Sequence, residues 1–433
     1  MKYFIFSAII SIGVATGAIV FFSYLHPPAQ FYNDKSLAEA SLASPQKSVE
    51  ERIEEAREKS SRIKGLYMTA DVANDAGTGA RRLREKIIGL AETTEINGIV
   101  IDVKEVCGPD YDEDALKKLI EELHQKNIWA IARIVLFKDA SQVQVHPEWY
   151  LTRVSRIAVG DNCARKHYLV EKNSSGQKPE VIFWQDKKGG YWMDPASSGV
   201  REHLAEFSKK MIDLGFDELQ FDYVRFPSDG DVANAKYPAW DYKMPKYKVL
   251  KSFFEFFSGT LKKYKPEIIL SADLFGYVAS QHEDLGIGQR LEDIGNNFDY
   301  ISFMVYPSHY YAGLYLPEDP VRHLPKVQFS YGQARTNPGV VVERSSMVAR
   351  DFLDGKLSTT SIATSTVRLA PRHEVRLRPW LEDFFHEDDR TSGRPYGEEK
   401  VRLQMKGAEE VEDHGWLLWN ASNVYTESAL DKE

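Results

Sequence analysis

The feature that most constrains the fold is an alternation of short apolar segments with amphipathic helical segments along most of the chain. From residue 65 onward, a short apolar run and a few polar residues are followed by apolar residues spaced i, i+3, i+4 and i+7. The predicted strands cover residues 65–73, 98–104, 129–137, 218–226, 268–275, 300–306, 377–384 and 416–420. Strands that alternate strictly with helices predict a parallel sheet.

Each helical segment carries one apolar face. Before the fifth strand, for example, Val249, Phe253 and Phe257 fall on one side of a helix. Gly215 and Gly415 follow helical segments and are expected to end them in the left-handed conformation. Eight alternating strands predict an α/β fold, a (β/α)8 TIM barrel. A doubly wound open sheet is the alternative, and the lack of a Gly-rich phosphate turn after the first strand disfavours it.

Two long insertions interrupt the alternation, residues 138–197 after the third strand and residues 311–376 after the sixth. The first contains hairpin-like sequence at 181–192. Both begin at the carboxyl-terminal ends of strands, where the active sites of such barrels lie. We therefore expect the insertions to form walls of a cleft.

The amino-terminal segment 4–25 is a run of 22 residues without a charge, preceded by Lys2. As a helix it would be about 33 Å long, enough to cross a bilayer. We predict an uncleaved single-pass anchor that keeps Lys2 inside and holds the barrel outside the cytoplasm at the cell membrane. A signal peptide cleaved near residues 15–18 is the alternative. The predicted divisions of the chain are an anchor at 1–28, a charged linker or stalk at 29–61, the barrel at 62–426 and a tail at 427–433.

Composition bears on partners and compartment. The net charge of -9 disfavours nucleic acid, whose binding relies on clustered Lys and Arg. Cys107 and Cys163 belong to no CxxC or Cys/His pattern, so a thiolate zinc site is not expected, and no cofactor is predicted. Whether the two cysteines form a disulfide stays open at this stage, as does the oligomeric state.

Polar side chains recur at the carboxyl-terminal ends of the predicted strands. The candidate substrate-binding residues are Asp71, Asp102, Lys104, Arg133, Arg225, Tyr306, His309, Trp380, Asp383, Trp419 and Asn420. A lone carboxylate on a strand is most simply part of a buried ion pair. Several carboxylates on one rim instead indicate a site, because like charges repel in a low dielectric.

The candidate catalytic residues are Asp222 and Asp273, at equivalent depth on the fourth and fifth strands. Glycoside hydrolysis needs two carboxyl groups beside the scissile bond, one to protonate the leaving oxygen and one to attack or to activate water. Arg225 is expected to favour the charged form of Asp222, because a nearby cation stabilises a carboxylate. Asp273, beside Leu274 and Phe275, is then expected to be the acid, although the reverse assignment stays open.

Several sequence strings around these residues resemble the bacterial putative glycosyl hydrolase domain family. They are GLYMT at 65–69, VIDVK at 100–104, HPEW at 146–149, FDELQFDYVRFPS at 216–228, MVYPSHY at 304–310, RPWLED at 378–383 and GWLLWNAS at 415–422. The resemblance covers about residues 62–426 and implies a TIM barrel that hydrolyses a polysaccharide or oligosaccharide. A more distant similarity to amylase-like barrels implies Asp222 as nucleophile and Asp273 as acid/base.

The chain departs from the family pattern at two places on the expected cleft rim. Where relatives tend to carry paired aspartates after VIDVK, this chain has Glu105-Val-Cys-Gly, and the stretch between His146 and Asp194 is longer. A barrel that binds glycans of the cell envelope without cleaving them is the alternative function. A metal-dependent hydrolase using His309 is disfavoured, because the sequence has no HxH or HExxH pattern.

Overall fold

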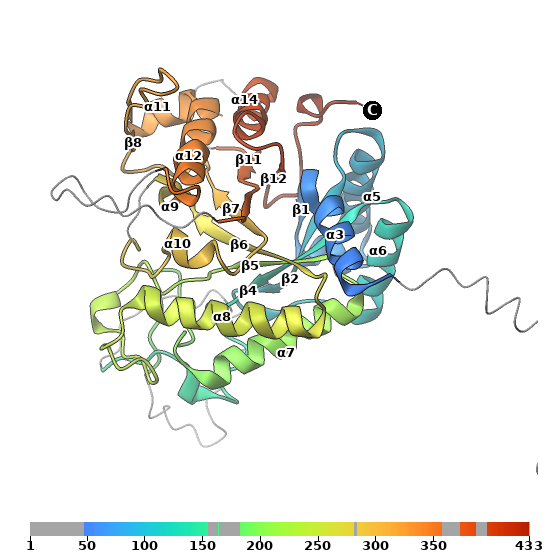
Figure 1. The fold of residues 1–433 in the computed structure, drawn as a ribbon. Coiled ribbons are helices and arrows are strands. Elements are labelled where there is room, and N and C mark those ends of the chain that lie inside the picture. The colour runs from blue at the N-terminus through green and yellow to red at the C-terminus, as the bar shows by residue number, and fades with distance from the viewer. Residues whose placement is uncertain are drawn as a thin grey trace, which may run out of the picture. The chain divides into compact units, whose positions relative to one another are not determined.

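A computed structural model describes residues 47–154, 163, 182–280, 284–356, 373–386 and 396–432. Its central sheet is a closed barrel of parallel strands, because β1 pairs both with β2 and with β12 (Figure 1). The barrel strands are β1 Ile63–Met68, β2 Gly98–Glu105, β4 Trp129–Val135, β5 Glu218–Asp222, β6 Ile269–Phe275, β7 Tyr300–Met304, the interrupted pair β10 Arg376–Leu377 and β11 Trp380–Glu382, and β12 Gly415–Trp419. The predicted TIM barrel is confirmed.

Helices connect the strands and surround the barrel (Figure 1). The α-helices are α3 Val49–Lys59, α4 Ala70–Asn74, α5 Thr78–Thr93, α6 Glu113–Gln125, α7 Ser198–Leu214, α8 Lys246–Tyr264, α9 Gly276–Ser280, α10 Leu291–Ile294, α11 Tyr331–Thr336, α12 Pro338–Leu353 and α14 Glu398–Glu409. The 3-10 turns are Ser60–Arg62, Pro147–Trp149, Val232–Asn234, Pro307–His309 and Glu427–Ala429.

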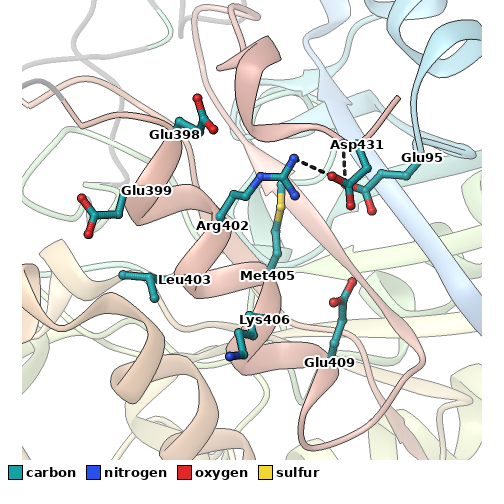
Figure 2. Close-up of a pocket in the computed structure, with 9 residues that line it drawn as sticks. All are labelled: Glu95, Glu398, Glu399, Arg402, Leu403, Met405, Lys406, Glu409 and Asp431. Carbon is teal, nitrogen blue, oxygen red and sulfur yellow. Dashed lines mark hydrogen bonds and ion pairs between the residues drawn. The ribbon is translucent and has the colours of Figure 1, made fainter. Parts of the chain in front are cut away.

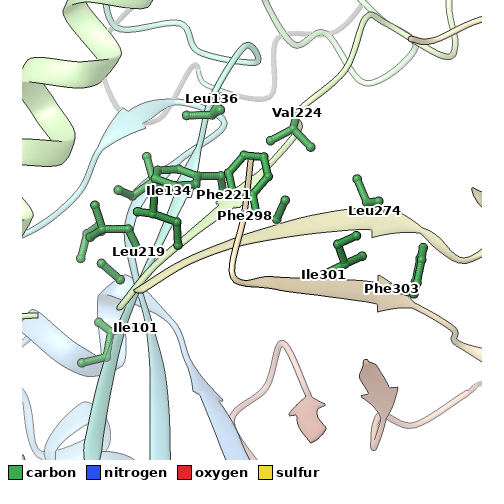
Figure 3. Close-up of a cluster of buried hydrophobic side chains, with 14 of the residues drawn as sticks. Ile101, Ile134, Leu136, Leu219, Phe221, Val224, Leu274, Phe298, Ile301 and Phe303 are labelled. Carbon is green, nitrogen blue, oxygen red and sulfur yellow. The ribbon is translucent and has the colours of Figure 1, made fainter. Parts of the chain in front are cut away.

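Alternate residues of each strand face two different apolar layers. One layer lies between strands and helices, and Figure 3 shows its members Ile101, Phe221 and Ile301. The other fills the barrel itself and includes Val100 and Ile131. Because side chains alternate between the two faces of a strand, residues 100 and 102 of β2 face the inside of the barrel, as do residues 131 and 133 of β4. Polar residues at the last inward position are thereby directed to the carboxyl-terminal mouth.

The fourth predicted strand, 218–226, ends at Asp222, the third and sixth each end two residues early, and two further strands are changed by single residues. The first ends at Met68, because Thr69 caps helix α4, its hydroxyl oxygen accepting a hydrogen bond from the Val72 amide. Asp71 therefore lies on a helix and not at a strand end. The seventh is divided at Pro379, which has no amide hydrogen for the ladder. Its first part pairs with β7 and its second mainly with β12.

The two glycines predicted as helix caps have different roles. Gly215 ends α7 with φ 106°, as expected. Gly415 also has a positive φ, of 85°, but it is the first residue of β12 and lies beyond the end of α14. A Cβ there would lie 2.0 Å from the Ile63 carbonyl oxygen. The prediction of a cap was wrong: close approach of β1 requires the glycine.

The insertion after β4 is folded back by isolated bridges, which join Lys138 to Trp192 and Gln185 to Tyr191. Cys107, beyond β2, forms a disulfide with Cys163 of this insertion. The insertion after β7 contains the antiparallel pair β8 Leu314–Leu316 and β9 Val327–Phe329. In the described ranges, no helix is long and apolar enough to cross a membrane, and the predicted span at 4–25 lies outside them.

Candidate active site

Arg133 of β4 lies at the carboxyl-terminal mouth of the barrel and faces three carboxylates. Its Nη1 is 2.5 Å from Asp102 Oδ1, its Nη2 pairs with Asp222, and its Nε is 3.8 Å from Asp273 Oδ2. Tyr67 of β1 donates its hydroxyl to the second oxygen of Asp102. Burial disfavours the charge of Arg133, but the carboxylates outweigh it and raise its pKa well above the ordinary value. One cation therefore holds together acids from β2, β5 and β6.

Asp273 has the surroundings of a proton donor. It is 1% exposed, and its Oδ1 accepts a hydrogen bond of 2.8 Å from the indole nitrogen of Trp380. Burial, and then the negative charge of Asp222, raise the pKa of Asp273 well above its ordinary value, while Arg133 and Trp380 oppose the shift. A carboxyl group that keeps its proton near neutral pH can act as a general acid.

Asp222 occupies the neighbouring position on β5. Phe221 lies opposite Ala272 in the parallel register, so the next residues on the two strands are Asp222 and Asp273. The Asp222 carboxylate also accepts a hydrogen bond of 2.5 Å from the Tyr223 amide. Tyr223 has φ 53°, which is uncommon for a residue with a side chain and concentrates at functional sites. The turn after β5 is thus held in an unfavourable conformation directly beside the carboxylate.

A cavity of about 760 Å³ opens above these residues. Eight of the residues predicted from the sequence line it: Arg133, Asp222, Arg225, Asp273, Tyr306, His309, Trp380 and Trp419. The rings of Tyr306 and Trp419 are stacked, with centroids 5.8 Å apart. Apolar ring faces beside acidic groups suit a sugar, which presents both C–H and hydroxyl surfaces.

Arg225 is close enough to Asp222 for their charges to interact, as the sequence suggested, but it is not the direct ion-pair partner of Asp222. Among the described contacts, the ion pair of Asp222 is with Arg133, and Arg225 forms none with it. The guanidinium of Arg225 instead lies 4.5 Å from the ring centre of Phe275 and 5.0 Å from that of Trp192. Burial lowers its pKa. The strand pattern could place Arg133 inside the barrel, and the pairing of β4 with β5 brings it beside Asp222.

A hydrogen-bonded chain fixes His309 at the cavity. The Ser308 hydroxyl donates to Glu382 Oε2 at 2.5 Å, and Ser308 Oγ lies 3.0 Å from His309 Nδ1. Since the hydroxyl hydrogen is directed to Glu382, His309 Nδ1 is the donor and Nε2 remains an acceptor. Burial lowers the pKa of His309, which favours this neutral ring.

Five predicted site residues do not line the cavity. Asp71 is exposed on α4. Asp102 lies behind Arg133 and reaches the cavity only through it. Lys104 is fully buried, with its Nζ 2.8 Å from Asp139 Oδ2 and 2.7 Å from the Val135 carbonyl oxygen. Lys104 is therefore held by the end of β4 and the start of the insertion that follows it, and it does not line the cavity.

Asp383 and Asn420 hold the end of the chain in place. The Asp383 carboxylate accepts hydrogen bonds of 2.7 and 2.6 Å from the amide and hydroxyl of Thr426. Asn420 donates to the Asp383 carbonyl oxygen at 2.6 Å and accepts from the Ser422 amide at 2.8 Å. Both side chains are satisfied by the protein itself, which explains why a polar residue stands at each strand end.

The cavity has further lining or supporting residues that the sequence did not single out. Tyr67 supports Asp102, while Tyr277, Tyr311, Lys187 and Lys188 line the cavity wall. Tyr67 could have been found, because it is the inward residue before the end of β1. Tyr277 lies on the short helix α9, directly after β6, and the other three belong to the insertions, where no period relates a residue to the barrel axis.

Other cavities lie away from the paired acids. One of about 650 Å³ borders α14, where Arg402 pairs with Asp431 and Glu95 accepts from the Asp431 amide (Figure 2). One of about 1180 Å³ contains Asp299 and Arg376, at the amino-terminal ends of β7 and β10. That is the face of a barrel associated with stability. Among the described residues, no group of three His, Cys, Asp or Glu side chains is arranged to hold a metal.

A family model described as a putative glycosyl hydrolase domain matches residues 65–425. No curated protein is similar enough to match the chain. The glycoside hydrolase domain of PgaB (BpsB) from Bordetella bronchiseptica is similar in structure, with TM-score 0.50 and 12% identity over 84% of this chain and 94% of that one. The corresponding domain of PelA from Pseudomonas aeruginosa has TM-score 0.37 and 10% identity over 84% and 96%. A hypothetical protein from Ruminiclostridium thermocellum has TM-score 0.36 and 23% identity over 51% and 98%.

Proposed function

Since the chain belongs to the putative glycosyl hydrolase domain family, we propose that it cleaves the glycosidic bonds of a polysaccharide or oligosaccharide with Asp222 and Asp273. The observation that carries the proposal is the pair itself. Two carboxyl groups stand side by side at the mouth of the barrel, and their surroundings differ. Asp222 is the ion-pair partner of Arg133, while burial and the charge of Asp222 raise the pKa of Asp273. Such a difference separates a nucleophile from an acid.

The reaction follows from these positions. Asp273 gives its proton to the glycosidic oxygen as the bond to the anomeric carbon breaks, and Asp222 attacks that carbon to form a glycosyl ester. Asp273, now ionised, accepts a proton from water, and the resulting hydroxide displaces Asp222. Arg133 neutralises the charge that returns to Asp222. His309 Nε2 can accept a hydrogen bond from a sugar hydroxyl, and Tyr306 and Trp419 provide ring faces.

The placement of the pair on adjacent strands is the basis for expecting retention of the anomeric configuration. Neighbouring strands are about 4.8 Å apart. Carboxyl separations of about 5–5.5 Å accompany retention, whereas inversion needs about 6.5–9.5 Å to admit a water molecule. We expect the first product observed by NMR to have the anomeric configuration of the substrate; an inverted first product would contradict the nucleophile assigned to Asp222.

The test of function is the release of reducing ends from a panel of envelope and plant polysaccharides by the full-length protein. A detergent without a sugar headgroup avoids a competing ligand. Asp222→Asn and Asp273→Asn should each abolish release while retaining the wild-type circular dichroism spectrum. Asp71→Asn, whose carboxylate is exposed and outside the cavity, is the control and should remain active. Glycan binding without release by any variant, wild type included, would support the non-catalytic glycan-binding barrel instead.

We also propose that residues 4–25 anchor the protein in the cell membrane with the barrel outside the cytoplasm. The Cys107–Cys163 disulfide supports an oxidising compartment. Protease added to intact cells should digest the barrel, and carbonate extraction should leave the full-length chain with the membrane. A barrel that is protected in intact cells and digested only after lysis would contradict this location.

A further inference from the structure

Two lysines of the insertion after β4 line the cavity. Lys187 and Lys188 occupy the turn of a short hairpin closed by the bridge between Gln185 and Tyr191. Both side chains are exposed, and both residues line the same cavity as Asp222 and Asp273. We refer to Lys187 and Lys188 as the basic tip.

The backbone of the basic tip is fixed from both sides. Asp186, directly before it, is buried and accepts hydrogen bonds from the Lys188 and Gly190 amides at 3.0 and 2.9 Å. The Lys187 amide donates to Asp229 Oδ1 at 3.0 Å, which joins the hairpin to the loop after β5. The two ammonium groups are therefore carried on a turn of defined position and not on a free loop.

No carboxylate of the described residues neutralises the basic tip. The charge of Asp186 is already balanced by Lys138, whose Nζ lies 2.7 Å from Asp186 Oδ2. Neither Lys187 Nζ nor Lys188 Nζ forms an ion pair in the part of the chain that the structure describes. The positive charge of Lys188 contributes to lowering the pKa of His309, so its field extends across the cavity.

The charges that line the cavity are consequently unbalanced. Arg133 is committed to Asp102 and Asp222, and burial raises the pKa of Asp273, the third acid that Arg133 faces. The other charged residues that line the cavity are three cations, the two lysines of the basic tip and Arg225, and one carboxylate, Asp229. A positive wall in a protein of net charge -9 is a local feature, and the focused field of a cleft attracts ligands of the opposite sign.

We propose that the basic tip binds an anionic substituent of the glycan, so that the substrate is an acidic polysaccharide with carboxylate or phosphate groups. This inference rests on the proposed function, because it places the anionic group on a sugar next to the one held between Asp222 and Asp273. A lysine ammonium is a compact charge on a flexible stem and pairs with carboxylate or phosphate without a fixed orientation. The basic tip therefore selects for charge, while the aromatic rings select for a sugar.

The test uses the full-length Asp273→Asn protein, so that the ligand is not consumed, and matched pairs of polymers that differ in charge. The pairs are polygalacturonate with its carboxyl-reduced form, and phosphorylated dextran with dextran. Calorimetry at about 50 mM salt should show at least about tenfold tighter binding to an acidic member. Adding Lys187→Gln and Lys188→Gln should remove most of that preference. Adding Lys117→Gln and Lys118→Gln, which removes the same charge from exposed positions on α6, should not.

The pair that shows the preference identifies the anionic group. Equal affinity for charged and neutral members, or a preference that survives loss of the basic tip, overturns the inference. Failure of the proposed function gives a different result. If the wild-type protein hydrolyses only neutral polymers, the proposal of an acidic substrate is refuted and the proposed hydrolase activity stands. If binding depends on charge through the basic tip but no polymer is hydrolysed, the proposed hydrolase activity is refuted and the basic tip remains a binding site.

Discussion

Removal of Arg133 should unfold the barrel more readily, because it leaves buried carboxylates without their cation. In Arg133→Met, Asp102 and Asp222 lose their ion pair while being only 1% and 6% exposed. Breaking one side of a buried pair costs about 3–5 kcal/mol. That is a large part of the total stability of a domain, roughly 5–15 kcal/mol. Urea titration followed by tryptophan fluorescence measures it, since the chain has 8 Trp.

The penalty should depend on pH in a defined direction. Arg133 opposes the rise in the pKa of Asp102 and of Asp273, so without it both folded-state pKa values rise further above the unfolded value. The folded protein then binds these two protons more tightly than the unfolded chain does. The stability that this gives is fully present below the unfolded pKa of about 3.9. It is lost as the pH rises through the folded pKa. Arg133→Met should therefore be close to wild type near pH 4 and fully destabilised near pH 8.

Two further variants isolate the cause. Asp102→Asn in the Arg133→Met background removes one of the stranded charges while keeping an acceptor for Tyr67, and should recover part of the loss. Arg62→Met removes an exposed pair with Asp413 and should change the unfolding free energy by less than about 1 kcal/mol. The ionic explanation would be refuted if Arg133→Met and Arg62→Met lowered the unfolding free energy equally at pH 7. It would also be refuted if the loss of stability in Arg133→Met became larger as the pH was lowered.

Three other results are expected. Asp273→Asn should abolish turnover yet stabilise the fold above neutral pH, because the wild-type carboxyl, with its raised pKa, must ionise in a buried position; a variant less stable than wild type at pH 8 would contradict this. Trp380→Phe removes the hydrogen bond that lowers the pKa of Asp273, so the alkaline limb of the kcat/KM profile should move to higher pH, and an unmoved or acid-shifted limb would argue against Asp273 as the acid. Replacing Cys107 and Cys163 by Ala opens a loop with a sequence separation of 56 and should lower the unfolding free energy by up to about 4 kcal/mol, measured in urea; no change would show that the disulfide does not restrict the unfolded chain.

The periodic part of the sequence predicted the fold well because burial repeats along it. Segments 98–104 and 129–137 were predicted as strands from their apolar residues, and barrel strands form there at Gly98–Glu105 and Trp129–Val135. Prediction was wrong where one residue overrode the pattern. Thr69 starts a helix within an apolar run, and Pro379 divides a strand, since capping and a missing amide act at single positions.

The candidate site was only partly foreseeable. Asp222 and Asp273 are inward residues at the ends of adjacent strands, so the alternation of side chains was sufficient to find them. Whether a strand-end polar residue reaches the cavity depends on its partners. Lys104 pairs with Asp139, and Asp383 accepts hydrogen bonds from Thr426. These partners are distant in sequence, so no local pattern could have predicted them.

The sequence by itself determined the architecture and the two acids, because the spacing of apolar residues sets which side of each strand is inward and how many strands must close. Tertiary structure decided the electrostatics. The pairing and register of β2, β4 and β5 bring Arg133 between Asp102 and Asp222, and only the fold of the insertion places Lys187 and Lys188 at the same cavity. The physical reason is the distance along the sequence over which each property is set. Side-chain periodicity depends on residues that are close in sequence, whereas charge pairing, burial and the resulting pKa shifts depend on residues that meet only in the folded protein.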